Sequence, residues 1–191
     1  VLGEAEVCFP EFLKDFCNGT ARHIYAAGDR KADVTQTPVP RFELLRFDRY
    51  LHVGIQVARG CPFKCEFCDI IELFGRVTRV KPVPQVIAEL QYLYDTGYRG
   101  HVDIVDDNFI GNKGAARALL PALRTWLEEH RWPFEFSTEA SINLANDDEL
   151  LKGMQEVGFS AVFVGIESPD AATLIATNKQ HNTTRPIAES I

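Results

Sequence analysis

Three cysteines lie within eight positions of one another, in the pattern Cys61-x-x-x-Cys65-x-x-Cys68. Thiolates this close in sequence can bind one soft metal centre without help from distant segments of the chain. No fourth cysteine follows nearby, although iron–sulfur clusters normally take four thiolates. A cluster bound here would therefore keep one iron without a protein ligand, and an open coordination position is typical of a catalytic metal site.

Two other roles for the cysteines fit the sequence less well. A structural zinc site needs a fourth Cys or His at short spacing, but His52 precedes the motif and His101 lies far beyond it. A disulfide framework is not expected in a chain with 5 cysteines, an odd number, and no secretory signal. Cys8 and Cys17 lie outside the motif, and we expect both to be buried as small hydrophobic residues.

The composition is that of an ordinary soluble protein, with 46% hydrophobic and 25% charged residues in 191. No apolar run is long enough to cross a bilayer, so no transmembrane segment is predicted. A net charge of −7 argues against a nucleic-acid partner, and reduced thiols favour the cytoplasm. Because the chain begins at Val1 and not at methionine, we expect it to be part of a longer protein.

The elements that must position the cysteines repeat as strand, loop and helix from residue 51 onward. Apolar runs predict four strands, at 51–58, 101–106, 134–139 and 161–166. Helical periodicity and capping residues predict helices that begin at Pro84, after Asn112, and after Asp147 or Asp148, with stops at Gly97 and Gly158. This alternation indicates an α/β fold with a parallel sheet of about four βα units.

Three further features of the chain carry structural predictions. Pro121 falls inside the second helix, which predicts a kink or a later helix start, and a last helix is predicted near 184–191. Residues 1–20 predict a strand end, a glycine turn and a helix with an apolar face formed by Phe9, Phe12, Leu13 and Phe16. Residues 21–50 have the character of a linker, in which 41–45 would form a short turn or helix beneath the sheet.

Polar residues follow each predicted strand. The cysteine loop comes after the first strand, Asp106-Asp107-Asn108 ends the second, Glu139 and Ser141 end the third, and Glu167-Ser168 follow the fourth. Because parallel strands place their carboxyl ends at one rim, we expect these groups to lie together and to form the binding site.

The run from Arg59 to Arg79, with Phe67 before the last cysteine, resembles the radical S-adenosylmethionine (SAM) enzymes. Within that superfamily it is most similar to the cobalamin-binding branch and its hopanoid methylase group. The resemblance implies a partial (β/α) barrel truncated after about four units, with residues 51–191 as an incomplete radical SAM core. Residues 1–20 would then be the end of a Rossmann-like cobalamin-binding domain, although no Asp-x-His-x-x-Gly cobalt-ligand motif occurs here.

The resemblance also implies roles for individual residues. Cys61, Cys65 and Cys68 would hold a 4Fe–4S cluster whose fourth iron binds SAM. The SAM contacts would come from Phe67, Asp106, Asp107, Asn108, Glu139, Gly165, Ile166 and Glu167. The resemblance does not decide which residue of Asp106-Asp107-Asn108 contacts SAM. Phe63, Phe67 and Phe74 would keep the cluster dry. Arg76, Arg79 and Lys81 are expected to form a solvated cationic face.

The implied reaction is reductive cleavage of SAM to a 5′-deoxyadenosyl radical, followed by cobalamin-dependent methyl transfer to an unactivated carbon of a lipid or other hydrophobic molecule. Such an enzyme would take electrons from a donor such as flavodoxin or ferredoxin. Radical rearrangement without methyl transfer stays open as an alternative. So do a zinc-stabilised binding module and a protein that uses its cluster only for electron transfer.

Overall fold

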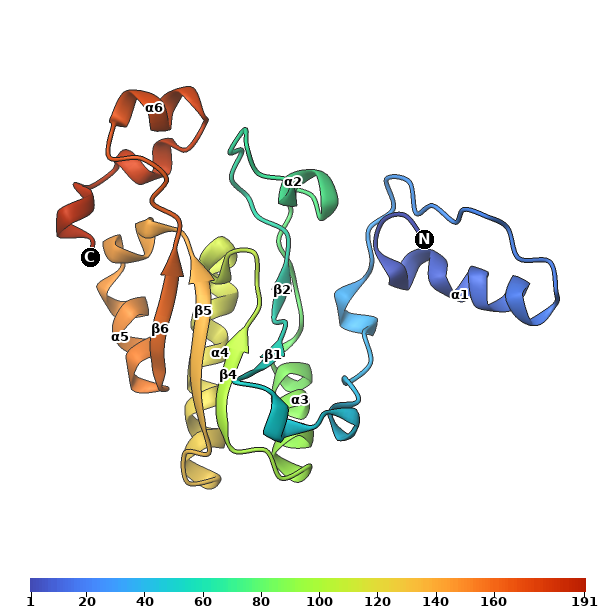
Figure 1. Cartoon of the computed structure of the whole chain (residues 1–191). Coiled ribbons are helices and arrows are strands. Elements are labelled where there is room, and N and C mark those ends of the chain that lie inside the picture. The colour runs from blue at the N-terminus through green and yellow to red at the C-terminus, as the bar shows by residue number, and fades with distance from the viewer.

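The computed structural model describes all of residues 1–191, and its centre is a four-stranded parallel sheet. The strands lie in the order β1-β4-β5-β6, with bounds Val53–Ile55, Gly100–Ile104, Phe134–Ala140 and Phe159–Val164. Their register pairs Ile55 with Ile104 and Ile104 with Thr138. All four carboxyl ends therefore point to one edge, at the top of Figure 1.

Three helices cover one face of this sheet (Figure 1): α3 (Val83–Asp95), α4 (Lys113–Glu129) and α5 (Asp148–Glu156). The predicted caps are present, because Asn112 accepts a hydrogen bond from the Ala115 N–H and Asp147 accepts one from the Leu150 N–H. Gly97 and Gly158 follow α3 and α5 with positive φ angles, so both helix stops are confirmed. The predicted α/β architecture with a parallel sheet is confirmed as a partial barrel.

The hydrophobic core lies between the sheet and these helices. Strand residues alternate, so one set faces the helices and the other faces the open side of the sheet. The buried set is apolar and includes Val53, Ile55, Val102, Ile104, Phe134 and Phe136. It packs against Leu90, Leu93, Leu119, Leu123, Leu150 and Met154 of the helices. Burial of this set fixes the register of the strands, and with it the height at which each carboxyl end leaves the sheet.

The first predicted strand, 51–58, is wrong in extent. The chain leaves the sheet after Ile55, and Ala58–Arg59 forms a separate strand, β2, that pairs antiparallel with β3 (Arg79–Val80). The reason is Asp106, whose Oδ1 accepts hydrogen bonds from the N–H groups of Val57 and Ala58 at 2.7 and 2.9 Å. These amides bond to a carboxylate instead of to a neighbouring strand.

The ends of several other elements also differ from the predictions. The second strand ends at Ile104 and the fourth spans 159–164, two residues earlier than expected. Helix α4 begins at Lys113 and continues through Pro121, so a later start is wrong: the cap at Asn112 starts the helix early. The tail carries only a short 3-10 turn, Ile187–Glu189, where a helix was expected, because Pro186 disfavours helical backbone at the residue before it. An unpredicted helix, α6 (Ala171–Ala176), precedes it.

The N-terminal segment contains the predicted helix, α1 (Ala5–Cys17), which lies apart from the sheet in Figure 1. Cys8 is fully buried as expected, but Cys17 is exposed, because it lies on the last turn with no segment packed over it. Of the apolar face, Phe12 packs against Tyr25, whereas Phe9, Leu13 and Phe16 remain exposed. Phe42, within the predicted 41–45 turn, joins the main core.

No helix of the structure combines the length and the apolar character that a bilayer crossing requires.

Candidate active site

The cysteine loop begins at a position that only glycine can occupy. Gly60 has φ +96°, and a Cβ atom there would lie 3.0 Å from the carbonyl oxygens of both Gly75 and Val77. The Gly60 N–H donates to Oδ2 of Asp107 at 2.7 Å, so the loop is tied to the carboxyl end of β4 one residue before Cys61. After the loop, the short helix α2 (Ile70–Leu73) returns the chain towards β3.

A cavity of about 200 Å³ lies between this loop and the strand ends. Most of the predicted site residues line it: Cys61, Cys65, Cys68, Phe67, Asp107, Asn108, Glu139, Gly165 and Glu167. They come from the cysteine loop and from the segments that follow β4, β5 and β6. The predicted rim at the carboxyl ends of the strands is therefore present around one cavity.

The three thiols of this cavity are free. Burial raises the pKa of Cys61 and of Cys65, and the nearby Lys179 ammonium opposes the shift at Cys65. No three Cys, His, Asp or Glu side chains anywhere in the chain are placed to hold one metal ion. The three thiols line one common space, and a 4Fe–4S cluster offers a separate iron to each cysteine.

Polar groups of the strand ends form a connected set beside Cys61. The side-chain amide of Asn108 donates to Ser141 Oγ at 3.1 Å and lies 3.8 Å from Cys61 Sγ, while its oxygen accepts from the Ser141 N–H. Burial raises the pKa of Asp107 and of Glu139, and the nearby carboxylates of Asp103 and Asp107 raise the pKa of Glu139 further. The cavity thus carries carboxylate hydrogen-bond acceptors beside the thiols.

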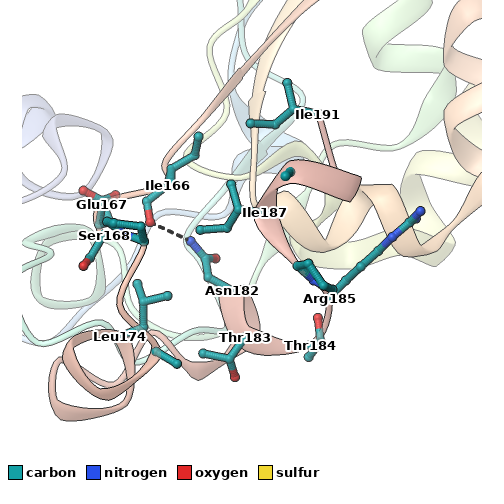
Figure 2. A pocket seen from close by; sticks show the side chains of 14 residues that line it. Ile166, Glu167, Ser168, Leu174, Asn182, Thr183, Thr184, Arg185, Ile187 and Ile191 are labelled. Atoms are coloured by element: carbon teal, nitrogen blue, oxygen red, sulfur yellow. Dashed lines mark hydrogen bonds between the residues drawn. The ribbon is translucent and has the colours of Figure 1, made fainter.

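Two predicted site residues do not line this cavity. Asp106 is 2% exposed and faces the core side of β4, where it holds the Val57 and Ala58 amides. Asp106 and Asp107 both follow the end of β4 at Ile104. There Asp107 and Asn108 line the cavity while Asp106 stays buried on the core side. Ile166 faces away as well and lines a neighbouring apolar pocket with Leu174 and Ile187 (Figure 2).

The sequence prediction missed a segment that covers the cavity. Residues 177–182 follow α6, and Lys179 and His181 line the cavity together with Phe163, which was not predicted, and Ser141, which was expected at the strand ends. The segment contacts the cysteine loop at two points: the Glu66 N–H donates to the Thr177 carbonyl at 3.0 Å, and His181 stacks on Phe63 with ring centroids 3.7 Å apart. Burial and Lys179 lower the pKa of His181 to about 4, so this ring is neutral.

Lys179 is the one ammonium or guanidinium group of the cavity lining. It is 7% exposed, its Nζ lies 2.6 Å from Oε1 of Glu167, and it sits 5.4 Å from the centre of the Phe67 ring. No sequence pattern singled it out, since it follows the last predicted strand in a stretch without periodicity. A cation held here can pair with an anionic group that enters the cavity.

Asn182 fixes the turn that presents Glu167. Its buried side-chain amide donates to the carbonyl oxygens of Gly165 and Ile166 at 2.9 and 3.2 Å, and the second bond is visible in Figure 2. Glu167 has φ +65°, a left-handed conformation that costs a non-glycine residue about 1–2 kcal/mol. The turn is therefore held in place by bonds to the segment that covers the cavity.

The basic run after the cysteine loop is not a solvated face. Arg79 lies 2.8 Å from Glu4, and Lys81 lies 2.7 Å from Glu89 in a pair that the core seals. Only Arg76 is exposed as predicted. These side chains are buried because β3 turns back against the body of the protein. Of the three phenylalanines expected near a cluster, Phe63 and Phe67 line the cavity, whereas Phe74 lies against Arg59 instead.

Comparison with known proteins agrees with this site. A family model described as the radical SAM superfamily matches residues 55–190. An uncharacterised methyltransferase of Synechocystis is 49% identical over 191 residues, which is 100% of this chain and 35% of that protein. A hopanoid C-2 methylase of Rhodopseudomonas palustris is 42% identical over 170 residues, covering 89% of this chain and 32% of the relative.

A solved structure of the radical enzyme OxsB, with aqua-cobalamin and SAM bound, has the same fold. Its TM-score is 0.77 at 16% identity, and the match covers 98% of this chain and 30% of that one. The chain thus spans about a third of the length of the relatives it matches. With the family model covering most of the chain and the cysteine motif lining a cavity at the strand ends, this chain belongs to the radical SAM superfamily.

Proposed function

We propose that the protein of which this chain is a part cleaves SAM reductively at a 4Fe–4S cluster held by Cys61, Cys65 and Cys68. It then transfers a methyl group, with cobalamin, to an unactivated carbon of a lipid or other hydrophobic small molecule. The observation that carries the proposal is the single cavity shared by three thiols and the polar rim of the sheet. The methylase and methyltransferase names of its relatives, and the cobalamin in the matched OxsB structure, support the methyl transfer.

The donor set fits the cluster. Three thiols without a fourth cysteine leave one iron open, and the aromatic rings of Phe63 and Phe67 line the cavity on the loop side. When bound, the cluster would supply the electron and cobalamin the methyl group. The chain itself binds, orients and desolvates the reactants.

The cavity lining suggests how SAM would be oriented. Asp107, Asn108 and Glu139 offer oxygen acceptors for the amino group and the ribose hydroxyls. Lys179 is placed to pair with the carboxylate of SAM. To do so it would release Glu167, its present partner. Gly165 leaves room for the Glu167 and Lys179 side chains, which lie 2.6 and 2.8 Å from where its Cβ would be, and adenine could approach this backbone once that pair opens. We now favour Asp107 and Asn108 over Asp106 for this role, and Gly165 over Ile166.

The proposal extends to partners and location. A reductively cleaved SAM needs a one-electron donor, and flavodoxin or ferredoxin has the required chemistry. An oxygen-sensitive cluster and free thiols suit the reducing cytoplasm. We place the end of the cobalamin-binding domain at residues 1–20, a linker at 21–50 and the radical SAM core at 51–191, and we expect no nucleic acid to bind.

The test is anaerobic reconstitution of the full-length protein with iron and sulfide, as wild type and as Cys65→Ala. Absorbance and electron paramagnetic resonance (EPR) spectra are recorded with and without SAM. We expect a 4Fe–4S signal that requires Cys65 and changes when SAM binds, followed by formation of 5′-deoxyadenosine under reducing conditions. Cys17→Ala, at an exposed cysteine outside the motif, is the matched control. Zinc without acid-labile sulfide, or no SAM cleavage by the loaded protein, would overturn the proposal.

A further inference from the structure

A buried carboxylate joins the N-terminal segment to the cysteine loop. Glu4 is 5% exposed and lies between two arginines. Arg59 donates to its Oε2 at 2.6 Å and Arg79 donates to the same oxygen at 2.9 Å. The second terminal nitrogen of Arg79 lies 2.8 Å from Oε1, without the angle of a hydrogen bond. We call Glu4, Arg59 and Arg79 the clamp.

The arginines of the clamp reach further segments. Arg79 also donates to the carbonyl oxygens of Ala32 and Phe74, at 2.6 and 3.0 Å. Arg59 donates to Gln56 at 3.0 Å and lies 5.5 Å from the centre of the Phe74 ring. The clamp therefore ties the start of α1, the 21–50 segment and both ends of the cysteine loop to one point.

The clamp acts close to the first cysteine. Arg59 is followed by Gly60, whose N–H is held by Asp107, and then by Cys61. The backbone before Cys61 is thus fixed from two directions, by the strand end through Asp107 and by the N-terminal segment through Glu4. Cys61 lies two residues after Arg59, and its N–H donates to the Gly75 carbonyl at 3.4 Å, so a shift of Arg59 is expected to disturb Cys61.

The energetics favour a positioning role over a stabilising one. Glu4 is the N-cap residue of α1, yet its side chain makes no capping bond and turns to the arginines instead. Burial opposes its charge, but the bonds from Arg79 and Arg59 outweigh burial and lower the pKa of Glu4. A buried ion pair gives little net stability compared with an apolar pair of similar volume, whereas it fixes geometry and is costly to break on one side.

We propose that Glu4, through Arg59 and Arg79, is a positioning residue that fixes the cysteine loop relative to the segment preceding the barrel. Under the proposed function, that segment leads from the cobalamin-binding domain, so the clamp would set the spacing between cobalt and cluster. The clamp itself follows from the contacts of this chain alone. Loss of Glu4 would loosen the loop around Cys61 even though Glu4 touches no cysteine.

The test compares Glu4→Gln with Glu11→Gln in the full-length, cluster-loaded protein, using hydrogen exchange and the EPR spectrum of the reduced cluster. Glu11 lies on α1 as well, but it is exposed and pairs only with Arg22. For Glu4→Gln we expect exchange in peptides covering 59–68 to rise about tenfold or more, because Arg79 loses its carboxylate partner and Arg59 keeps only Glu6, 2.9 Å away. The cluster signal should broaden, and Glu11→Gln should change neither measurement.

Glu4→Asp keeps the negative charge on a shorter side chain, so hydrogen exchange in the 59–68 peptides should rise by an intermediate amount. This variant replaces Glu4→Gln in the test if Glu4→Gln does not fold. Faster exchange confined to residues 1–17, with the 59–68 peptides and the cluster signal as in wild type, would overturn the proposal. The exchange measurement needs neither cobalamin nor SAM turnover. A protein that binds no cobalamin would therefore contradict the proposed function while leaving the clamp result readable.

Discussion

Two lysine–glutamate pairs of nearly equal length differ in their exposure to solvent. Lys81 and Glu89 lie 2.7 Å apart between β3 and α3, and both side chains are sealed from solvent. Lys179 and Glu167 lie 2.6 Å apart at the cluster cavity, where the lysine is buried but the glutamate side chain is 42% exposed. The first pair has no partner to exchange, whereas the second can release its lysine to an anion because water can solvate the glutamate left behind.

The sealed pair is the one whose loss should cost the most stability. Lys81→Met leaves Glu89 as a buried carboxylate without its cation, and burial already raises the pKa of Glu89 against the opposing effect of Lys81. We expect the free energy of unfolding to fall by about 3–5 kcal/mol, as urea titration of the cluster-free protein would show. The exposed Lys152→Met is the matched control. A loss no larger than that of the control would mean that the two pairs do not differ.

Loss of the partly exposed pair, Lys179 and Glu167, should affect SAM binding more than stability. Lys179→Met removes the cavity cation, so we expect the affinity for SAM to fall about tenfold or more while stability changes by about 1 kcal/mol or less. SAM titration of the cluster-loaded full-length protein, followed by EPR, measures the first effect and urea titration the second. The Lys81→Met protein, once folded, should bind SAM as wild type does. A large stability loss with unchanged SAM affinity would make Lys179 a structural residue like Lys81.

Asp106 adds a third case to the comparison of the two pairs, because its buried carboxylate forms no ion pair with a lysine or arginine. Burial raises its pKa to about 7, against the usual 3.8, despite the bonds from the Ala58 and Val57 amides. The folded protein therefore keeps a proton that the unfolded chain releases, so stability should fall as pH rises from about 4 through about 7. Asp106→Asn retains an oxygen for both amides and should flatten this fall. Urea midpoints from about pH 5 to about pH 8 measure it, with the exposed Asp148→Asn as control.

An equal pH slope in the Asp106→Asn and wild-type proteins would show that Asp106 stays ionised in the fold. In that case the Asp106 carboxylate would be stabilised in its charged form, unlike the carboxylate of Glu89, whose pKa burial raises.

The same contrast explains what the sequence could predict. The cysteine motif and the strand-end residues were found because their chemistry is local: the thiols are neighbours in sequence, and each polar residue ends its own strand. The sequence could not separate Asp107 from Asp106, because both follow the end of β4 at Ile104, where the alternation of a strand no longer applies. Local patterns gave the order of strands and helices and most of the cavity lining.

Lys179, His181 and Asn182 could not be found in this way. They lie beyond the last strand, in 3-10 and irregular backbone, and each gains its role from a partner distant in sequence, such as Phe63 or Gly165. Glu4 was missed for the same reason, since its partners Arg59 and Arg79 follow it by more than fifty residues. A buried charge pair leaves no periodic signal in the sequence.

The bond between the Glu66 N–H and the Thr177 carbonyl bears on how the protein is assembled. The cysteine loop emerges early in synthesis, but the segment that closes over it is made more than a hundred residues later. Contacts between such distant segments form late in folding, because the intervening chain must be ordered first. The newly made loop is therefore open until residues 177–182 pack against it, and under the proposed function the cluster would have its widest access to the thiols during that interval.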